Sequence, residues 1–177
     1  MCAAASVNLA DQQSRSTPPQ IEIHRLRPGD DATPFRVLNE EWITSYFVLE
    51  DKDKETLGDP ENKILRRGGH ILLAYSGSDP VGCVALVSAG EGAYEVSKMA
   101  VSSLLRGRGI GRRLLEHAIS LARTLGATSL FLASSTKLPP AIHLYESVGF
   151  KHVPPESLPP SAYARSDVFM RLVLRPD

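Results

Sequence analysis

Arginine and glycine alternate from Arg106 to Gly111, and an amphipathic run begins directly after them. Glycine lets the backbone approach a ligand closely, and the free N–H groups and the dipole at the start of a helix favour an anion. Arg106, Arg108 and Arg112 add positive charge to this stretch. The pattern predicts a site that holds a diphosphate, and the alternative is an ordinary loop whose arginines face solvent.

Two familiar phosphate-binding motifs do not fit this stretch. A Walker A loop needs a lysine and then Ser or Thr after its last glycine, whereas Arg112 and Arg113 follow Gly111. A dinucleotide-binding fingerprint that starts at Gly107 would need a third glycine at position 112, which is arginine. A dinucleotide-binding enzyme is therefore excluded by the glycine spacing.

The composition is that of a globular protein without an overall charge. The 177 residues are 42% hydrophobic and 23% charged, and 20 basic residues balance 20 acidic ones. Because there is no global basic field, we expect no nucleic-acid partner. No apolar stretch approaches about 20 residues, so we expect no membrane association either.

Cysteine and histidine usage indicates neither disulfides nor a metal. The two cysteines, Cys2 and Cys83, do not form a framework, and the five histidines lack ligand spacing. We therefore expect no metal and a reducing, cytoplasmic compartment. Residues 1–19 do not resemble a secretory signal and are predicted to be a disordered tail, which leaves residues 20–177 as the domain.

Hydrophobic periodicity predicts a domain of the α/β (α+β) class. Helices are expected from residue 33 to about 47, over a short segment from Pro60 to Gly68, from 110 to about 126, and from 139 to 149. The three middle strands should form an antiparallel meander because short turns join them. The expected strands are 21–26, 70–76, 81–88, 93–101, 128–134 and 163–174.

Two stretches resemble signatures of the GNAT superfamily of acyl-CoA-dependent N-acyltransferases. The first signature, [Q/R]-x-x-G-x-[G/A] between a strand and a long helix, is matched by Arg106, Gly109 and Gly111. The second, A-x-x-L-Y-x-x-x-G-F on a helix, is matched by "PAIHLYESVGF" at residues 140–150. The resemblance covers about residues 20–175. It implies a mixed, mostly antiparallel twisted sheet of six to seven strands flanked by about four helices.

The resemblance implies direct transfer of an acetyl group from acetyl-CoA to a primary amine in a ternary complex. The arginine–glycine loop would cradle the diphosphate, the backbone of Met99 and Val101 would bond the pantetheine arm, and the Met99 N–H would face the acyl carbonyl. Tyr145 would protonate the leaving sulfur. The expected cofactor-binding residues are Met99, Ala100, Val101, Arg106, Gly107, Arg108, Gly109, Ile110, Gly111, Arg112, Ser135, Ala141 and Tyr145.

Glu95 is the candidate general base. It lies on the strand that ends near Met99, and the period of two places it on one face with Ser97 and Met99. Lys98 is expected to point to the opposite face as a solvated or structural charge. Some members of the superfamily, notably histone acetyltransferases, carry a glutamate at the matching place. The alternative is an exposed strand carboxylate without a catalytic role.

One position departs from the family pattern. Many relatives carry an asparagine seven residues before the tyrosine, and Leu138 stands there. Ser134, Ser135 and Thr136 precede it and are candidates for the missing polar contact to pantetheine. His143 is expected to be a surface residue of the helix.

The acceptor side is predicted from the segment "LNEEWITSYFVLED" at residues 38–51. Trp42, Tyr46, Phe47 and Glu50 are expected to form a substrate cavity with an acidic rim that suits a cationic amine. Alternatively, the aromatic residues only pack this helix onto the sheet. The loop at residues 154–167 is a candidate lid over the same mouth.

The sequence leaves three functions open. The favoured acceptor is a primary amine on a small molecule, and the alternative is a protein N-terminus or lysine. A non-catalytic acyl-CoA-binding sensor is a more distant alternative. Homodimer formation is left open by the sequence.

Overall fold

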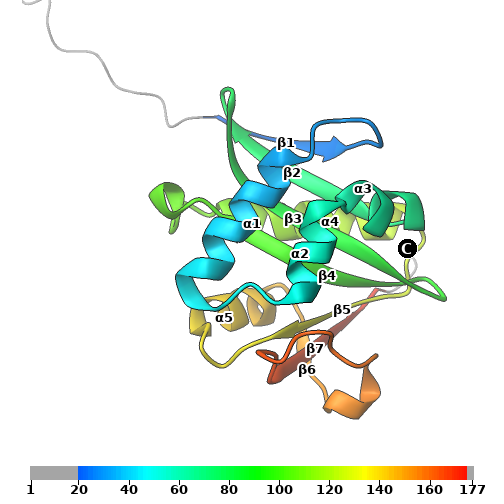
Figure 1. Cartoon of the computed structure of the whole chain (residues 1–177). Coiled ribbons are helices and arrows are strands. Elements are labelled where there is room, and N and C mark those ends of the chain that lie inside the picture. Colours follow the sequence, from blue (N-terminus) through cyan, green and yellow to red (C-terminus); the bar gives the residue numbers. More distant parts are fainter. Residues whose placement is uncertain (1–19, 175–177) are drawn as a thin grey trace, which may run out of the picture.

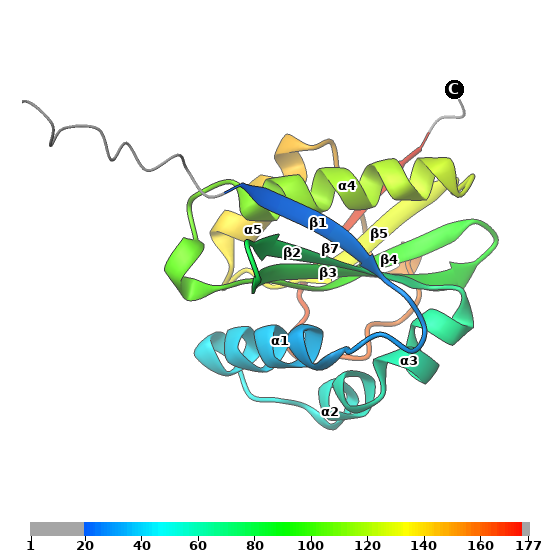
Figure 2. The same cartoon turned by 90° about the horizontal axis from the view of Figure 1, so that it is seen from above.

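The fold is one twisted sheet between two layers of helices (Figures 1 and 2). The computed structural model describes residues 20–174, and the predicted tail at residues 1–19 lies outside them. Helices α1, α2 and α3 cover one face of the sheet, and α4 and α5 cover the other. The helical elements are α1 (Thr33–Tyr46), α2 (Asp51–Gly58), α3 (Pro60–Lys63), η1 (Leu65–Arg67), η2 (Ser103–Leu105), α4 (Ile110–Thr124), α5 (Pro139–Ser147) and η3 (Pro155–Ser157).

The sheet has seven strands in the order β1-β2-β3-β4-β5-β7-β6. All neighbours are antiparallel except β4 and β5, so the predicted meander and the mostly antiparallel sheet are confirmed. The two-residue strand β6 was not predicted, and the last strand begins at Val168 rather than at residue 163. The strands are β1 (Ile21–Leu26), β2 (His70–Ser76), β3 (Asp79–Gly90), β4 (Ala93–Val101), β5 (Ser129–Ser134), β6 (Lys151–His152) and β7 (Val168–Val173).

Each helix layer has its own hydrophobic core. The apolar stripe of α4 at Ile110, Leu114 and Ala118 is buried against one face of β2, β3 and β4, as its helical spacing predicts. On the other face, Phe35 and Ile43 of α1 are buried together with residues of α2 and the following turn. None of the described helices is long and apolar enough to cross a membrane.

Helix α2 was not predicted, because its sequence is almost entirely polar. A capping box stabilises its start. The Glu50 N–H donates to the Asp53 carboxylate at 3.0 Å, and the Glu50 carboxylate accepts from the Asp53 N–H. Asp53, Thr56 and Leu57 form its buried face. The helix therefore depends on tertiary contacts of a few residues rather than on an apolar stripe.

Strands β4 and β5 separate over their second halves (Figure 1). Only Ala93 to Glu95 pair with β5, although β4 continues to Val101. On its other side β4 carries a bulge, because Ser97 pairs with Ala85 but the next register partner of β3 is Ala100, opposite Cys83. The second half of β4 is thus free of a neighbour on the β5 side, and its backbone is irregular.

The turn from α3 through η1 into β2 is closed at Gly69, whose N–H donates to the Ile64 carbonyl at 2.9 Å. A Cβ at Gly69 would lie 2.7 Å from the Leu86 carbonyl oxygen and 2.8 Å from that of Ile64. Because both obstacles are backbone atoms, they cannot move aside cheaply. At Gly58, by contrast, an added Cβ meets nothing within 4 Å.

We expect Gly69→Ala to lower the free energy of unfolding by about 1–3 kcal/mol, as overpacking does. Gly58→Ala should be neutral or stabilising by up to about 1 kcal/mol, since alanine favours the helix. Urea denaturation of both variants measures this difference. A Gly69→Ala variant as stable as Gly58→Ala would contradict the described packing of this turn.

Candidate active site

The N-terminal end of α4 forms one wall of a groove of about 730 Å³, here named the α4 groove. Its other walls come from the end of β4, the start of α5 and the C-terminal half of α1. It brings together eleven of the predicted cofactor-binding residues: Met99, Ala100, Val101, Arg106, Gly107, Gly109, Ile110, Gly111, Arg112, Ala141 and Tyr145. Arg108 and Ser135 do not line it.

The loop before α4 presents bare backbone to this groove. Gly107 and Gly109 both have a φ of 76°, the left-handed region that favours glycine, and Gly109 is the N-cap of α4. The first intrahelical bond runs from the Arg113 N–H to the Gly109 carbonyl at 3.1 Å. The N–H groups of residues 110–112 precede it, so this helix end can receive an anion.

Arg106 connects this loop to α1. Its guanidinium donates to the Tyr46 hydroxyl at 3.0 Å and lies 5.4 Å from the Tyr46 ring centroid. Tyr46, predicted as an acceptor contact, therefore lies at the α4 groove. Arg112 donates to the Ser147 hydroxyl of α5 at 2.7 Å, which fixes α5 beside the loop.

A second cavity, here named the central pocket, lies where β4 and β5 separate. It shares Trp42, Met99 and Tyr145 with the α4 groove and is also lined by Glu95 and Ser97. The Tyr145 ring packs against Phe150 at 6.0 Å, and burial raises the pKa of the Tyr145 hydroxyl to about 12. The phenol is therefore protonated at neutral pH and can act as an acid.

Glu95 is half-buried and lines both the central pocket and a third cavity, here named the outer pocket. Burial raises the pKa of its carboxyl group, although the positive charge of Lys98 opposes the shift. A carboxylate with a raised pKa is a stronger base than an exposed one. The structure thus places Glu95 and Tyr145 on the same central pocket.

The period of two predicted that Lys98 points away from Glu95, but the structure places both side chains on the same cavity. The φ of Lys98 is +52°, because it lies in the bulge of β4. It lines the outer pocket together with Glu95 and Ser97. Met99, beyond the bulge, packs instead with the core on the α4 side. The bulge interrupts the alternation on which the prediction depended.

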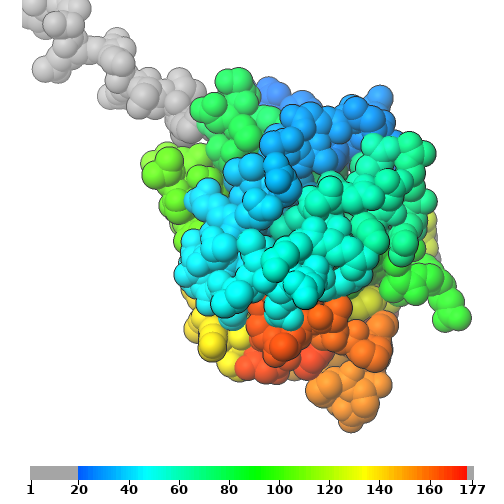
Figure 3. All heavy atoms as spheres, viewed as in Figure 1, coloured from blue at the N-terminus to red at the C-terminus, as the bar shows by residue number. Residues whose placement is uncertain are grey.

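Lys98 belongs to a buried ionic cluster under the outer pocket. Its ammonium contacts Asp53 at 2.5 Å, and Arg165 donates to the same carboxylate at 2.7 and 2.8 Å. Burial alone would raise the pKa of Asp53, but the hydrogen bonds from Arg165 and Lys98 outweigh it and lower the pKa. Lys98 also donates to the Tyr163 hydroxyl at 2.8 Å. The cluster fastens α2 and the loop before β7 to the bulge, and these segments lie against each other in Figure 3.

The structure does not gather the four predicted acceptor residues around one cavity. Trp42 lines the α4 groove and the central pocket, and Tyr46 lines the groove alone. Phe47 packs among core residues and lines neither these two cavities nor the outer one. Glu50 forms an ion pair with Arg165 at 2.9 Å, so it supplies no acidic rim.

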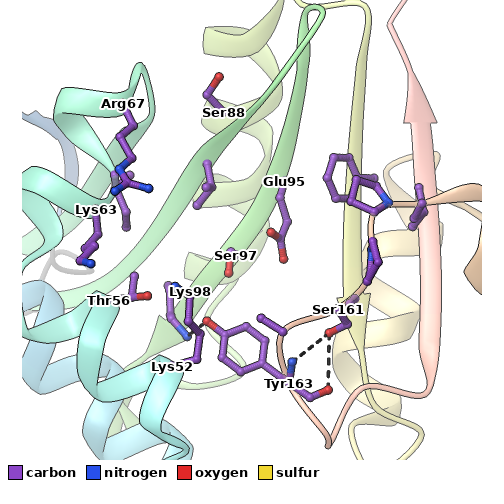
Figure 4. A pocket seen from close by; sticks show the side chains of 18 of the residues that line it. Lys52, Thr56, Lys63, Arg67, Ser88, Glu95, Ser97, Lys98, Ser161 and Tyr163 are labelled. Atoms are coloured by element: carbon purple, nitrogen blue, oxygen red, sulfur yellow. Dashed lines mark hydrogen bonds between the residues drawn. The ribbon is translucent and has the colours of Figure 1, made fainter.

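The outer pocket has a basic lining in place of the predicted acidic rim. Its volume is about 230 Å³, and Lys52, Lys63 and Arg67 line it opposite Glu95 (Figure 4). The loop before β7, the predicted lid, supplies another wall at residues 158–163. These three cations were not predicted from the sequence, because they lie on polar helices without a motif.

The segment that departs from the family pattern is partly committed to local contacts. Ser135 is buried and accepts a hydrogen bond from the Lys137 N–H at 3.3 Å, and the Thr136 hydroxyl donates to Asp167 at 2.7 Å. Ser134 lines the central pocket. His143 is exposed on α5, as expected, and lines the α4 groove.

We expect Asp53→Asn to lower the free energy of unfolding by about 3–5 kcal/mol, because it leaves the buried charges of Lys98 and Arg165 without their shared partner. Asp51→Asn, on the exposed side of the same helix, is the matched control and should leave stability almost unchanged. Chemical denaturation measures both. Equal effects of the two substitutions would show that the cluster does not hold α2 in place.

Known proteins resemble this chain in both sequence and structure. The family model described as "Acetyltransferase (GNAT) family" matches residues 35–150. An IAA acetyltransferase of Azospirillum brasilense is 38% identical over 75% of this chain and 85% of its own length. The N-alpha-acetyltransferase RimI of Mycobacterium tuberculosis is 32% identical over 73% of this chain and 68% of its own length.

Solved structures share the fold at lower identity. A GNAT-family acetyltransferase from Staphylococcus aureus Mu50 has a TM-score of 0.80 at 20% identity, over 88% of this chain and 100% of its own. The PaiA N-acetyltransferase of Thermoplasma acidophilum, solved in complex with coenzyme A, has a TM-score of 0.67 at 19% identity, over 88% and 99%. Together with the match over residues 35–150, these likenesses show that the chain belongs to the GNAT acetyltransferase family.

Proposed function

We propose that this protein transfers an acetyl group from acetyl-CoA to a primary amine of a small molecule, by direct attack in a ternary complex. The observation that carries the proposal is that the central pocket adjoins both the α4 groove and the outer pocket. The central pocket shares Met99 and Tyr145 with the α4 groove, and it shares Glu95 with the outer pocket. Two substrates that enter from opposite sides would meet there.

The α4 groove suits the diphosphate of coenzyme A in charge. The N–H groups of residues 110–112 and the charge of Arg106 and Arg112, which both line the groove, would receive the diphosphate. The pantetheine arm would follow the unpaired side of β4 toward Met99. The coenzyme A complex of the Thermoplasma acidophilum protein, which has this fold, supports the same donor.

The bulge explains how Met99 would stabilise the oxyanion. In the described sheet, β3 has no register partner for Met99, and β5 pairs with β4 only as far as Glu95. Met99 therefore has no register partner on either side. A backbone N–H that is fixed in place but not used by the sheet can donate to the negative charge that develops on a thioester carbonyl.

The reaction then needs three proton transfers. Glu95 takes a proton from the ammonium of the acceptor, directly or through water, and the neutral nitrogen attacks the thioester carbonyl. The C–N bond forms, the C–S bond breaks as Tyr145 gives its proton to the leaving sulfur, and the second proton lost by the nitrogen returns to the Tyr145 phenolate. The raised pKa values of both groups suit these roles, since Glu95 becomes a stronger base and Tyr145 stays protonated until the thiolate forms.

The size of the outer pocket, about 230 Å³, supports a small acceptor, and the loop at residues 158–163 narrows it further. A protein N-terminus is the second candidate. Its support is the 32% identity to an N-alpha-acetyltransferase. A peptide acceptor would require this loop to move away from the pocket.

We expect Tyr145→Phe and Glu95→Gln each to lower kcat by about a hundredfold or more, while the Kd for coenzyme A stays unchanged. Glu95→Gln should not lower the thermal midpoint at neutral pH. The folded protein raises the pKa of this carboxyl, so its contribution to stability is present at low pH and is lost as the pH rises through the folded pKa.

Thiol release from acetyl-CoA with an amine panel, together with calorimetric titration of coenzyme A, measures both quantities. Wild-type turnover in both variants would exclude these roles. Tight binding of acetyl-CoA without turnover of any amine would favour the acyl-CoA-binding sensor instead.

A further inference from the structure

We infer that the acceptor carries an anionic group, a carboxylate, in addition to its amine, so that it is a small amino acid rather than a diamine. The inference rests on the proposed function and concerns the outer pocket. In Figure 4, Lys63 and Arg67 lie on the side of α3 and η1, while Glu95 points into the pocket from β4. One carboxylate therefore faces a basic wall across the cavity.

The basic wall consists of Lys52, Lys63 and Arg67. It keeps a net positive charge after its own ion pairs are counted. Lys52 contacts Glu55 at 2.9 Å, and Lys63 forms an ion pair with the same carboxylate. Arg67 has no carboxylate partner within 4 Å among residues 20–174. Three cations share one carboxylate, which leaves two positive charges on this wall.

The deeper charged layer does not cancel this excess. Lys98 and Arg165 pair with Asp53 and Glu50, so two cations face two carboxylates and the layer is neutral. Glu95 is then the remaining carboxylate of the pocket lining. An amine that reaches the acyl centre meets one acid at Glu95, and the far end of the same molecule meets uncompensated positive charge.

This field discriminates between acceptors by charge. An amino acid would place its ammonium at Glu95 and its carboxylate near Arg67 and Lys63, where both charges are complemented. A diamine would place its second ammonium against the same two cations, which costs affinity. An amine without a second charged group gains nothing from the wall. The small volume of the pocket favours a short chain between the two groups.

The test compares matched acceptors in the full-length protein. The panel contains glycine, β-alanine, γ-aminobutyrate, glutamate and aspartate, the carboxamide of each carboxylate, and the diamines of equal chain length. We expect acids to be acetylated with a kcat/KM at least about tenfold above that of their amides and diamines. Raising the salt concentration should reduce this preference, because exposed charges are screened.

Substitutions assign the preference to the wall. Arg67→Gln should raise KM for the preferred acid about tenfold, leave the amide unaffected, and leave the Kd for coenzyme A unchanged. Arg67→Glu should abolish the preference. Arg66→Gln is the control, since Arg66 is exposed, is paired with Glu61 and does not line the pocket.

The outcomes separate this inference from the proposed function. Preferred use of diamines or amides, or use of no acid while coenzyme A still binds, overturns the anionic acceptor and leaves cofactor binding intact. A preference for acids that persists in Arg67→Glu overturns the role of the wall. Failure to bind coenzyme A overturns the proposed function itself.

Discussion

The site depends on the separation of β4 from β5 and on the bulge at Lys98 that accompanies it. Beyond Glu95 the two strands no longer pair, and the bulge removes Met99 from the ladder with β3. Lys98 has a positive φ there, which an L-residue adopts only when its surroundings hold it. Its ion pair with Asp53, shared with Arg165, supplies that restraint and joins α2, β4 and the loop before β7 at one point.

That arrangement explains why the α4 groove was predictable from the sequence and the outer pocket was not. The α4 groove is built from local signals: glycines that need a positive φ, a helix start, and the apolar stripe of α4. Each of these acts over a few residues, so the sequence shows it directly. The meander of β2, β3 and β4 followed from short turns in the same way.

The outer pocket depends on contacts between residues far apart in the chain. Glu50 looked like an acidic rim, but Arg165, 115 residues later, pairs with it. Helix α2 lacks an apolar stripe and is held by Asp53, so neither the helix nor the position of Lys52 was predicted. The bulge leaves no mark in the alternation of β4, and Lys98 was therefore assigned to the wrong face.

The most direct test of this account is a crystal structure of the protein with coenzyme A and an acceptor analogue. We expect the diphosphate on the N–H groups of residues 110–112, the sulfur between Met99 and Tyr145, and the amine beside Glu95 in the gap between β4 and β5. Coenzyme A bound away from the start of α4, or a sulfur that does not reach the central pocket, would contradict it.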